Sequence, residues 1–159
     1  VEAHKCILAA AVPYFAAAFQ GPWKETTDDC RWNTTNSSSV VRAVMQFVYV
    51  GEVDQSLLES ETEALLSVAS EYRIDALRRV CEGKCMEKIS LGTVKSILQL
   101  ANVHELDGLK QKCFDFVHEN SATILTERGF MSLADEDAAL WAELSTAVRS
   151  RHGKRRRSS

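Results

Sequence analysis

Long apolar runs are missing from this sequence. No stretch approaches the roughly 20 consecutive apolar residues that a helix needs to cross a bilayer. The first four residues, Val-Glu-Ala-His, also lack the basic segment and apolar run of a secretory signal. Only two prolines are present, and the seven glycines are scattered singly, so there is no glycine-rich loop for a phosphate group. We therefore predict no membrane partner and no cofactor.

The basic residues are unevenly distributed along the chain. The net charge is −3, but the last residues are strongly basic, which makes the preceding body more acidic than the total indicates. An acidic body argues against a nucleic-acid-binding fold, because such folds present a basic face. We therefore predict no specific nucleic-acid partner. The run of Lys154, Arg155, Arg156 and Arg157 has two open interpretations: a nuclear-targeting signal or polyanion contact, or a solvated tail.

The five cysteines are odd in number and irregular in spacing, which favours free thiols in a reducing compartment over a disulfide framework. His4 and Cys6 are two residues apart, so on a helix they point to different sides and do not form a nucleophile–base pair. Cys81 and Cys85 share a helix face and could supply two metal ligands, whereas structural zinc needs four. We predict packed core thiols, no metal site and no enzymatic activity.

The first half of the chain predicts short helices separated by a polar loop. Apolar residues recur at helical spacing from 4 to 19, and Pro13 should divide this segment into two helices. Residues 20–39 are polar and predict a loop or a short irregular strand around 30–32. A helix should follow over 40–50, capped by one of the serines 37–39 and ended by Gly51. It is apolar nearly all round, which indicates deep burial or a partner on its second face.

The second half contains an internal repeat of 32 residues. Two helical hairpins are predicted at 61–89 and 93–120, with apolar residues at matching positions. Asp75 and Asp107 fall where each second helix needs an N-cap, and Cys81 and Cys113 occupy equivalent core positions. A further helix is expected over 135–148, followed by disorder in the basic residues 150–159.

Several segments together resemble a BTB/POZ domain: His4-Lys5-x-Ile7-Leu8-Ala9-Ala10, Pro13-x-Phe15, Phe19, Phe47-Val48-Tyr49-Val50-Gly51-Glu52-Val53, Leu65-Leu66-x-Val68-Ala69-x-x-Tyr72 and Leu77-x-x-x-Cys81-Glu82. The segments that follow are similar to the 3-box and truncated BACK region of speckle-type POZ proteins, which also carry a MATH domain: His104, Leu109-Lys110 and Cys113-x-x-Phe116-Val117-x-x-Asn120.

The resemblance implies a mostly α (α+β) fold in three parts. Residues 1–88 would be an N-terminally truncated BTB/POZ domain with a small residual sheet, 89–148 a 3-box/BACK-like helical extension, and 149–159 a disordered basic tail. The family's first helix and strand, which build much of its homodimer interface, would precede Val1. We therefore expect self-association through this domain to be weak.

The resemblance also implies a function. Such proteins are adaptors that bind cullin-3 and recruit substrates to a cullin-3 RING ubiquitin ligase for degradation. The expected contact residues are Val41, Val44, Met45 and Tyr49. The family's hydrophobic-x-Glu contact motif aligns with Val41-Arg42-Ala43, so that Ala43 replaces the Glu and cullin-3 binding should be weakened.

The alternative is a nuclear scaffold or transcriptional co-regulator that self-associates and uses Lys154, Arg155, Arg156 and Arg157 for localisation. The expected compartment is accordingly the nucleus, the cytoplasm or both.

Overall fold

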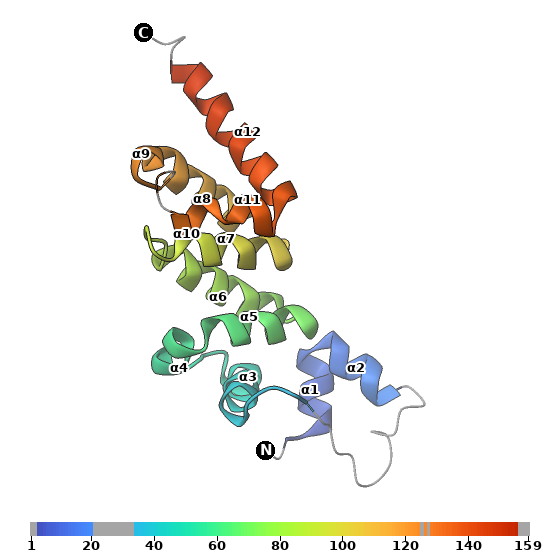
Figure 1. Ribbon diagram of the computed structural model, residues 1–159. Helices are drawn as coiled ribbons and strands as arrows, with labels where there is room; N and C mark the ends of the chain where they lie inside the picture. Colours follow the sequence, from blue (N-terminus) through green and yellow to red (C-terminus); the bar gives the residue numbers. More distant parts are fainter. Residues whose placement is uncertain (1–2, 21–33, 125, 127, 156–159) are drawn as a thin grey trace. The chain divides into compact units, whose positions relative to one another are not determined.

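The computed structural model describes residues 3–20, 34–124, 126 and 128–155 (Figure 1). These residues form helices and turns, with no strand among them, which confirms the mostly α class. The small residual sheet is thus not seen in the described part, and residues 30–32, where an irregular strand was predicted, lie outside it. The chain divides into two compact units, Val1–Lys84 and Cys85–Ser159, each considered by itself below.

Unit 1 is built from short helices. Its elements are α1 (Lys5–Ala11), α2 (Pro13–Gln20), α3 (Ser38–Val50), α4 (Gln55–Ser60), α5 (Thr62–Glu71) and the first part of α6 (Asp75–Glu87). Pro13 begins α2, where its missing N–H is not needed. Val12 has the extended conformation that a following proline imposes, with φ −131° and ψ 111°. The predicted division into two helices at Pro13 is therefore confirmed.

An aromatic cluster joins α2 to the end of α5. Phe15 and Tyr72 are both buried, with ring centroids 5.5 Å apart, and the more exposed Tyr14 lies 4.8 Å from Tyr72. Burial raises the pKa of the Tyr72 phenol, and a side-chain hydrogen bond with Thr34 partly offsets this. The cluster therefore also fixes the segment that leads into α3.

Unit 2 contains the end of α6 and the remaining helices: α7 (Val94–Val103), α8 (Asp107–Glu119), α9 (Ser121–Ile124), α10 (Arg128–Met131), α11 (Leu133–Glu136) and α12 (Ala138–Arg155). The single helix predicted over 135–148 is in fact two helices. The division falls at Asp137, whose carboxylate accepts a hydrogen bond from the Leu140 N–H (2.9 Å) and so caps α12. α12 also continues to Arg155, further than the sequence pattern predicted.

The two predicted hairpins, α5–α6 and α7–α8, turn in the same way. Arg73 and Glu105, 32 residues apart, have φ values of 55° and 52°. The next N–H in each turn reaches back across it: Ile74 donates to the Ala69 carbonyl (2.8 Å), and Leu106 donates to that of Ala101 (2.9 Å). This is a Schellman motif with a residue other than glycine in the left-handed position. The repeat read from the sequence is therefore a repeat of backbone structure.

The predicted N-caps need a correction. Asp75 and Asp107 are the first residues inside α6 and α8, and the N-cap of α8 is Leu106, which makes no side-chain capping bond. The Schellman motif explains the shift, because its last residue already occupies the N-cap position. The two aspartates instead place negative charge in the first turn, where it interacts favourably with the helix dipole.

We predict that Arg73→Gly and Glu105→Gly will each raise the free energy of unfolding by about 0.5–1 kcal/mol. A left-handed conformation costs an L-residue about 1–2 kcal/mol, and the entropy that glycine adds to the unfolded chain offsets part of the gain. Urea unfolding of the two variants would measure the effect.

Gln111→Gly is a matched control, because Gln111 is exposed within α8. There the same substitution should lower the free energy by about 1 kcal/mol. If Arg73→Gly and Glu105→Gly also lowered the free energy of unfolding by this amount, the left-handed conformation of the two turns would be contradicted.

Candidate protein-interaction surface

The core side of α3 is fixed by small apolar residues. Val40 and Val44 are 1% exposed and Ala43 is 0% exposed, and α3 packs against α1, α4 and α5. The helix begins as predicted, because the Ser37 hydroxyl accepts a hydrogen bond from the Val40 N–H (3.3 Å). It ends as predicted at Gly51, which has a φ of 82° and donates its N–H to the Phe47 carbonyl (2.7 Å).

The C-terminal part of the other side of α3 is apolar and open to solvent. Tyr49 is 41% exposed and Val50 is 67% exposed. The His4 N–H donates to the Tyr49 hydroxyl (2.7 Å), and His4 Nδ1 lies 3.0 Å from the same oxygen. These contacts hold the Tyr49 ring against the start of α1, so that its ordering in a complex would cost little conformational entropy.

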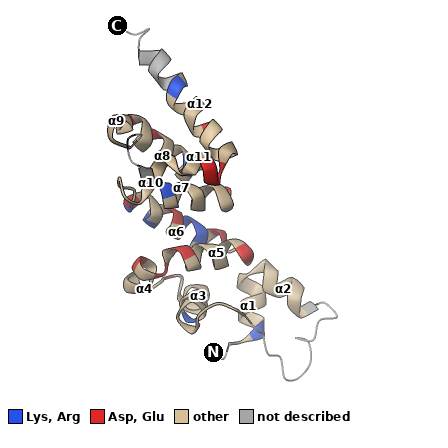
Figure 2. Ribbon diagram, viewed as in Figure 1, with Lys and Arg blue, Asp and Glu red and all other residues tan. Residues whose placement is uncertain are grey.

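Charged side chains are sparse around this surface. α2 carries none, α1 carries only Lys5, and α3 carries only Arg42, as Figure 2 shows. The central parts of protein–protein interfaces are likewise depleted in charged residues and enriched in aromatic ones. The exposed C-terminal end of α3, with Tyr49 and Val50, thus has the composition of a protein contact.

The structure separates the four predicted contact residues. Positions 41, 45 and 49 recur every fourth residue and share one stripe of α3. Along this stripe Val41 is partly exposed, Met45 is 8% exposed and Tyr49 is exposed. Val44 instead lies on the core side, so its side chain is not available to a partner. We refer to Val41, Met45 and Tyr49 as the α3 stripe.

Ala43 also belongs to the core side of α3. The alignment with a hydrophobic-x-Glu motif treats position 43 as a missing contact Glu, but its Cβ is fully buried. A carboxylate at this position would lie in apolar surroundings, where an ionised group is strongly destabilising. In this structure Ala43 is therefore a packing residue.

The basic residues predicted for nuclear targeting lie at the end of α12. Lys154 and Arg155 are the last two residues of the helix. Arg156 and Arg157 lie outside the described residues.

None of the cysteines in the described part of the chain forms a disulfide, and Cys30 lies outside that part. Cys81 and Cys113 are both fully buried, which confirms their prediction as equivalent core residues. Burial raises the pKa of the Cys113 thiol to about 12, and the nearby Cys85 contributes in the same direction. This thiol is therefore protonated at neutral pH and is a poor nucleophile.

The described residues contain neither a cluster of metal ligands nor a membrane-spanning helix. None of their His, Cys, Asp and Glu side chains form a group of three or more that could hold a metal ion. Within them, no helix has both the length and the apolar character required to span a bilayer.

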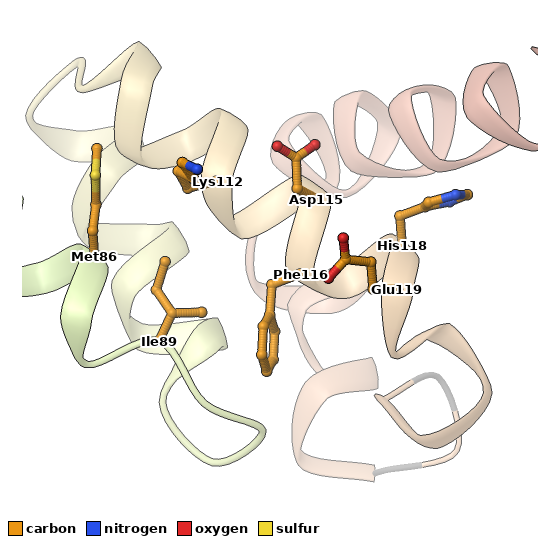
Figure 3. A pocket seen from close by; sticks show the side chains of 7 residues that line it. All are labelled: Met86, Ile89, Lys112, Asp115, Phe116, His118 and Glu119. Carbon is orange, nitrogen blue, oxygen red and sulfur yellow. The ribbon is translucent and has the colours of Figure 1, made fainter.

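Sequence reasoning missed a hollow of about 360 Å³ on unit 2 (Figure 3). Met86, Ile89 and Phe116 supply its apolar surface. The charged side chains of Lys112 and Glu119 also line it. These two residues are seven positions apart and share one face of α8. Asp115 and His118 complete the lining. The lining is suited to an apolar group flanked by polar ones, and the only signal for it in the sequence is the spacing of these residues along α8.

Comparison with known proteins identifies the first unit. The BTB/POZ domain model matches residues 1–89, and the chain therefore belongs to the BTB/POZ domain family. BTB/POZ domains are protein-interaction domains, so the general class of function follows from the match.

A curated relative covers more of the chain. TD and POZ domain-containing protein 4 of Mus musculus is 29% identical over 142 residues. The alignment covers 89% of this chain and 38% of that protein, so the chain spans about two fifths of the length of this curated relative.

We predict that Ala43→Glu will destabilise the protein by more than about 2 kcal/mol and will not strengthen partner binding. The substitution places an unpaired charge against α5, and effects of this size are typical of that change. Thermal unfolding followed by circular dichroism would measure the loss.

Arg42→Glu, on the neighbouring exposed position, is the matched control and should leave the melting temperature nearly unchanged. A stable Ala43→Glu variant with stronger cullin-3 binding would show that position 43 faces the partner.

Proposed function

We propose that this chain is a protein-interaction adaptor that recruits substrates to a cullin-3 RING ubiquitin ligase. The proposal builds on membership of the BTB/POZ family and on the resemblance of the following helices to a 3-box/BACK extension. The single observation that carries it is the α3 stripe, a partly exposed and uncharged stripe on a helix whose other side is fully packed.

The chemistry of the α3 stripe favours an apolar partner surface. Tyr49 offers a large ring already held by His4, and aromatic residues of this kind often dominate interface energies. Val41 extends the stripe toward the start of the helix. Met45, largely buried between them, supplies a flexible side chain that can adjust to a partner.

The contact Glu of the hydrophobic-x-Glu pattern has two other candidate positions. Val50-Gly51-Glu52 follows the α3 stripe directly, and both Val50 and Glu52 are exposed. Trp23-Lys24-Glu25 also fits the pattern and lies outside the described residues. Either carboxylate would supply the charged contact that Ala43 does not.

We predict that Val41→Glu will weaken binding to the N-terminal domain of cullin-3 at least tenfold, because it places an unpaired charge within an apolar contact. A pull-down with purified cullin-3, followed by titration calorimetry, would measure the change. Glu25→Gln and Glu52→Gln, tested in parallel, would identify which carboxylate contributes.

Gln46→Glu is the matched control, since it adds the same charge to an exposed position of α3 away from the stripe. Its affinity should remain within about twofold of the unmodified chain. Equal affinities for Val41→Glu and Gln46→Glu, with both variants folded, would refute this placement of the contact.

The alternative function is a nuclear scaffold or transcriptional co-regulator that self-associates through the BTB/POZ domain. The observation that favours it is the concentration of basic residues at the end of α12. We expect that deletion of residues 154–157 will shift a fluorescently tagged chain from nucleus to cytoplasm.

Lys112→Gln, which removes one positive charge from an exposed position of α8 in unit 2, should leave the distribution unchanged. A nuclear fraction that is unaffected by the deletion would argue against a targeting role for the basic run. Loss of cullin-3 binding in Val41→Glu, together with normal localisation of the chain that lacks residues 154–157, would favour the adaptor function alone.

A further inference from the structure

α7 carries two adjacent stripes with different roles. Its apolar stripe is buried in the hairpin with α8 and consists of Val94, Ile97, Leu98 and Ala101. Beside it, Lys95, Gln99 and Asn102 recur at intervals of four and three residues and form a polar stripe. All three side chains of the polar stripe contact residues 132–137, which include α11.

Lys95 and Gln99 hold the carboxylate of Glu136 from both sides. Lys95 Nζ donates to Glu136 Oε1 (2.6 Å) and to Ser132 Oγ (2.6 Å), and Gln99 Nε2 donates to Glu136 Oε2 (2.9 Å). The hydrogen bonds from Lys95, Ser132 and Gln99 hold the pKa of Glu136 below its ordinary value. The carboxylate is therefore ionised at neutral pH, and the contact with Lys95 is an ion pair.

Lys110 of α8 makes a second set of contacts on the first turns of α12. Lys110 Nζ lies 2.5 Å from Glu143 Oε2 and donates to Asn102 Oδ1 (2.9 Å). Asn102 in turn donates through Nδ2 to Asp137 Oδ2 (3.1 Å), and the other oxygen of Asp137 caps α12. Two neighbouring sets of polar contacts thus join α7 and α8 to the junction between α11 and α12, and we refer to both together as the network. We call residues 132–143 the α11–α12 corner.

Apolar packing and polar contacts hold the corner in different ways. Leu133, Leu140 and Leu144 are buried, and this packing keeps α11 and α12 on the unit. Apolar packing has no preferred direction, whereas each hydrogen bond fixes the position of one atom relative to another. The carboxylate partners Glu136 and Glu143 are about half exposed, so their ion pairs are weakened by solvent. The polar contacts therefore have good hydrogen-bond geometry, but each ion pair contributes little free energy and is easily broken.

We propose that the positive charges of Lys95 and Lys110 form a clamp that fixes the α11–α12 corner, and that neutralising both lysines releases this corner while the α7–α8 hairpin stays folded. The hairpin retains its own apolar core and its Schellman turn at Glu105, neither of which uses these lysines.

Hydrogen exchange of the full chain tests the clamp. In the double variant Lys95→Gln/Lys110→Gln, amides of residues 133–148 should exchange at least fivefold faster, while buried amides of α7 and α8 keep their rates. Lys112→Gln, on an exposed position of α8, controls for the loss of a lysine and should change neither set. Lys95→Arg/Lys110→Arg keeps the charges and should exchange more slowly at 133–148 than the Gln variant.

Two outcomes would overturn the proposal. Unchanged exchange at 133–148 in the Gln double variant would show that apolar packing alone fixes the corner. Faster exchange spread evenly over α7, α8 and α12 would show that the lysines contribute to the stability of the whole unit and do not form a local clamp.

Discussion

The rotation of α3 about its own axis is the constraint on which the interaction surface depends. Val40, Ala43 and Val44 must face the core that α3 shares with α1, α4 and α5. Because a helix turns by 100° per residue, this burial determines the direction of every other side chain on α3. It places Val41 and Tyr49 toward solvent and Met45 between them. Ser37 and Gly51 fix the two ends of the helix, and therefore the length of the stripe that a partner can use.

The arrangement of helices in unit 2 is fixed in a different way. A backbone turn that also occurs between α5 and α6 is combined there with a polar network. The left-handed residue at Glu105 closes the α7–α8 hairpin in the same way that Arg73 closes α5–α6. Once α7 and α8 are paired, the polar stripe of α7 and Lys110 of α8 offer directed contacts to the next segment. The helices after α8 are short until α12, so their placement requires such contacts in addition to apolar burial.

The two units accordingly suit different tasks. The α3 stripe has few charges and one ring held in place, and these properties favour a stable contact with an apolar partner. The α11–α12 corner is held by half-exposed ion pairs, which respond to changes in charge.

The sequence by itself determined most of the helices, because their causes are local. Pro13 breaks a helix by its ring, Gly51 ends one by its positive φ, and the matching of Cys81 with Cys113 follows from spacing alone. Tertiary structure decided the rest. It buried Ala43 and Val44 in the core and brought Lys95 to Glu136 across 41 residues of chain. These features depend on contacts between segments that are distant in the sequence. Helical periodicity predicts which side of its helix a residue lies on, but it does not predict which neighbouring segment covers that side.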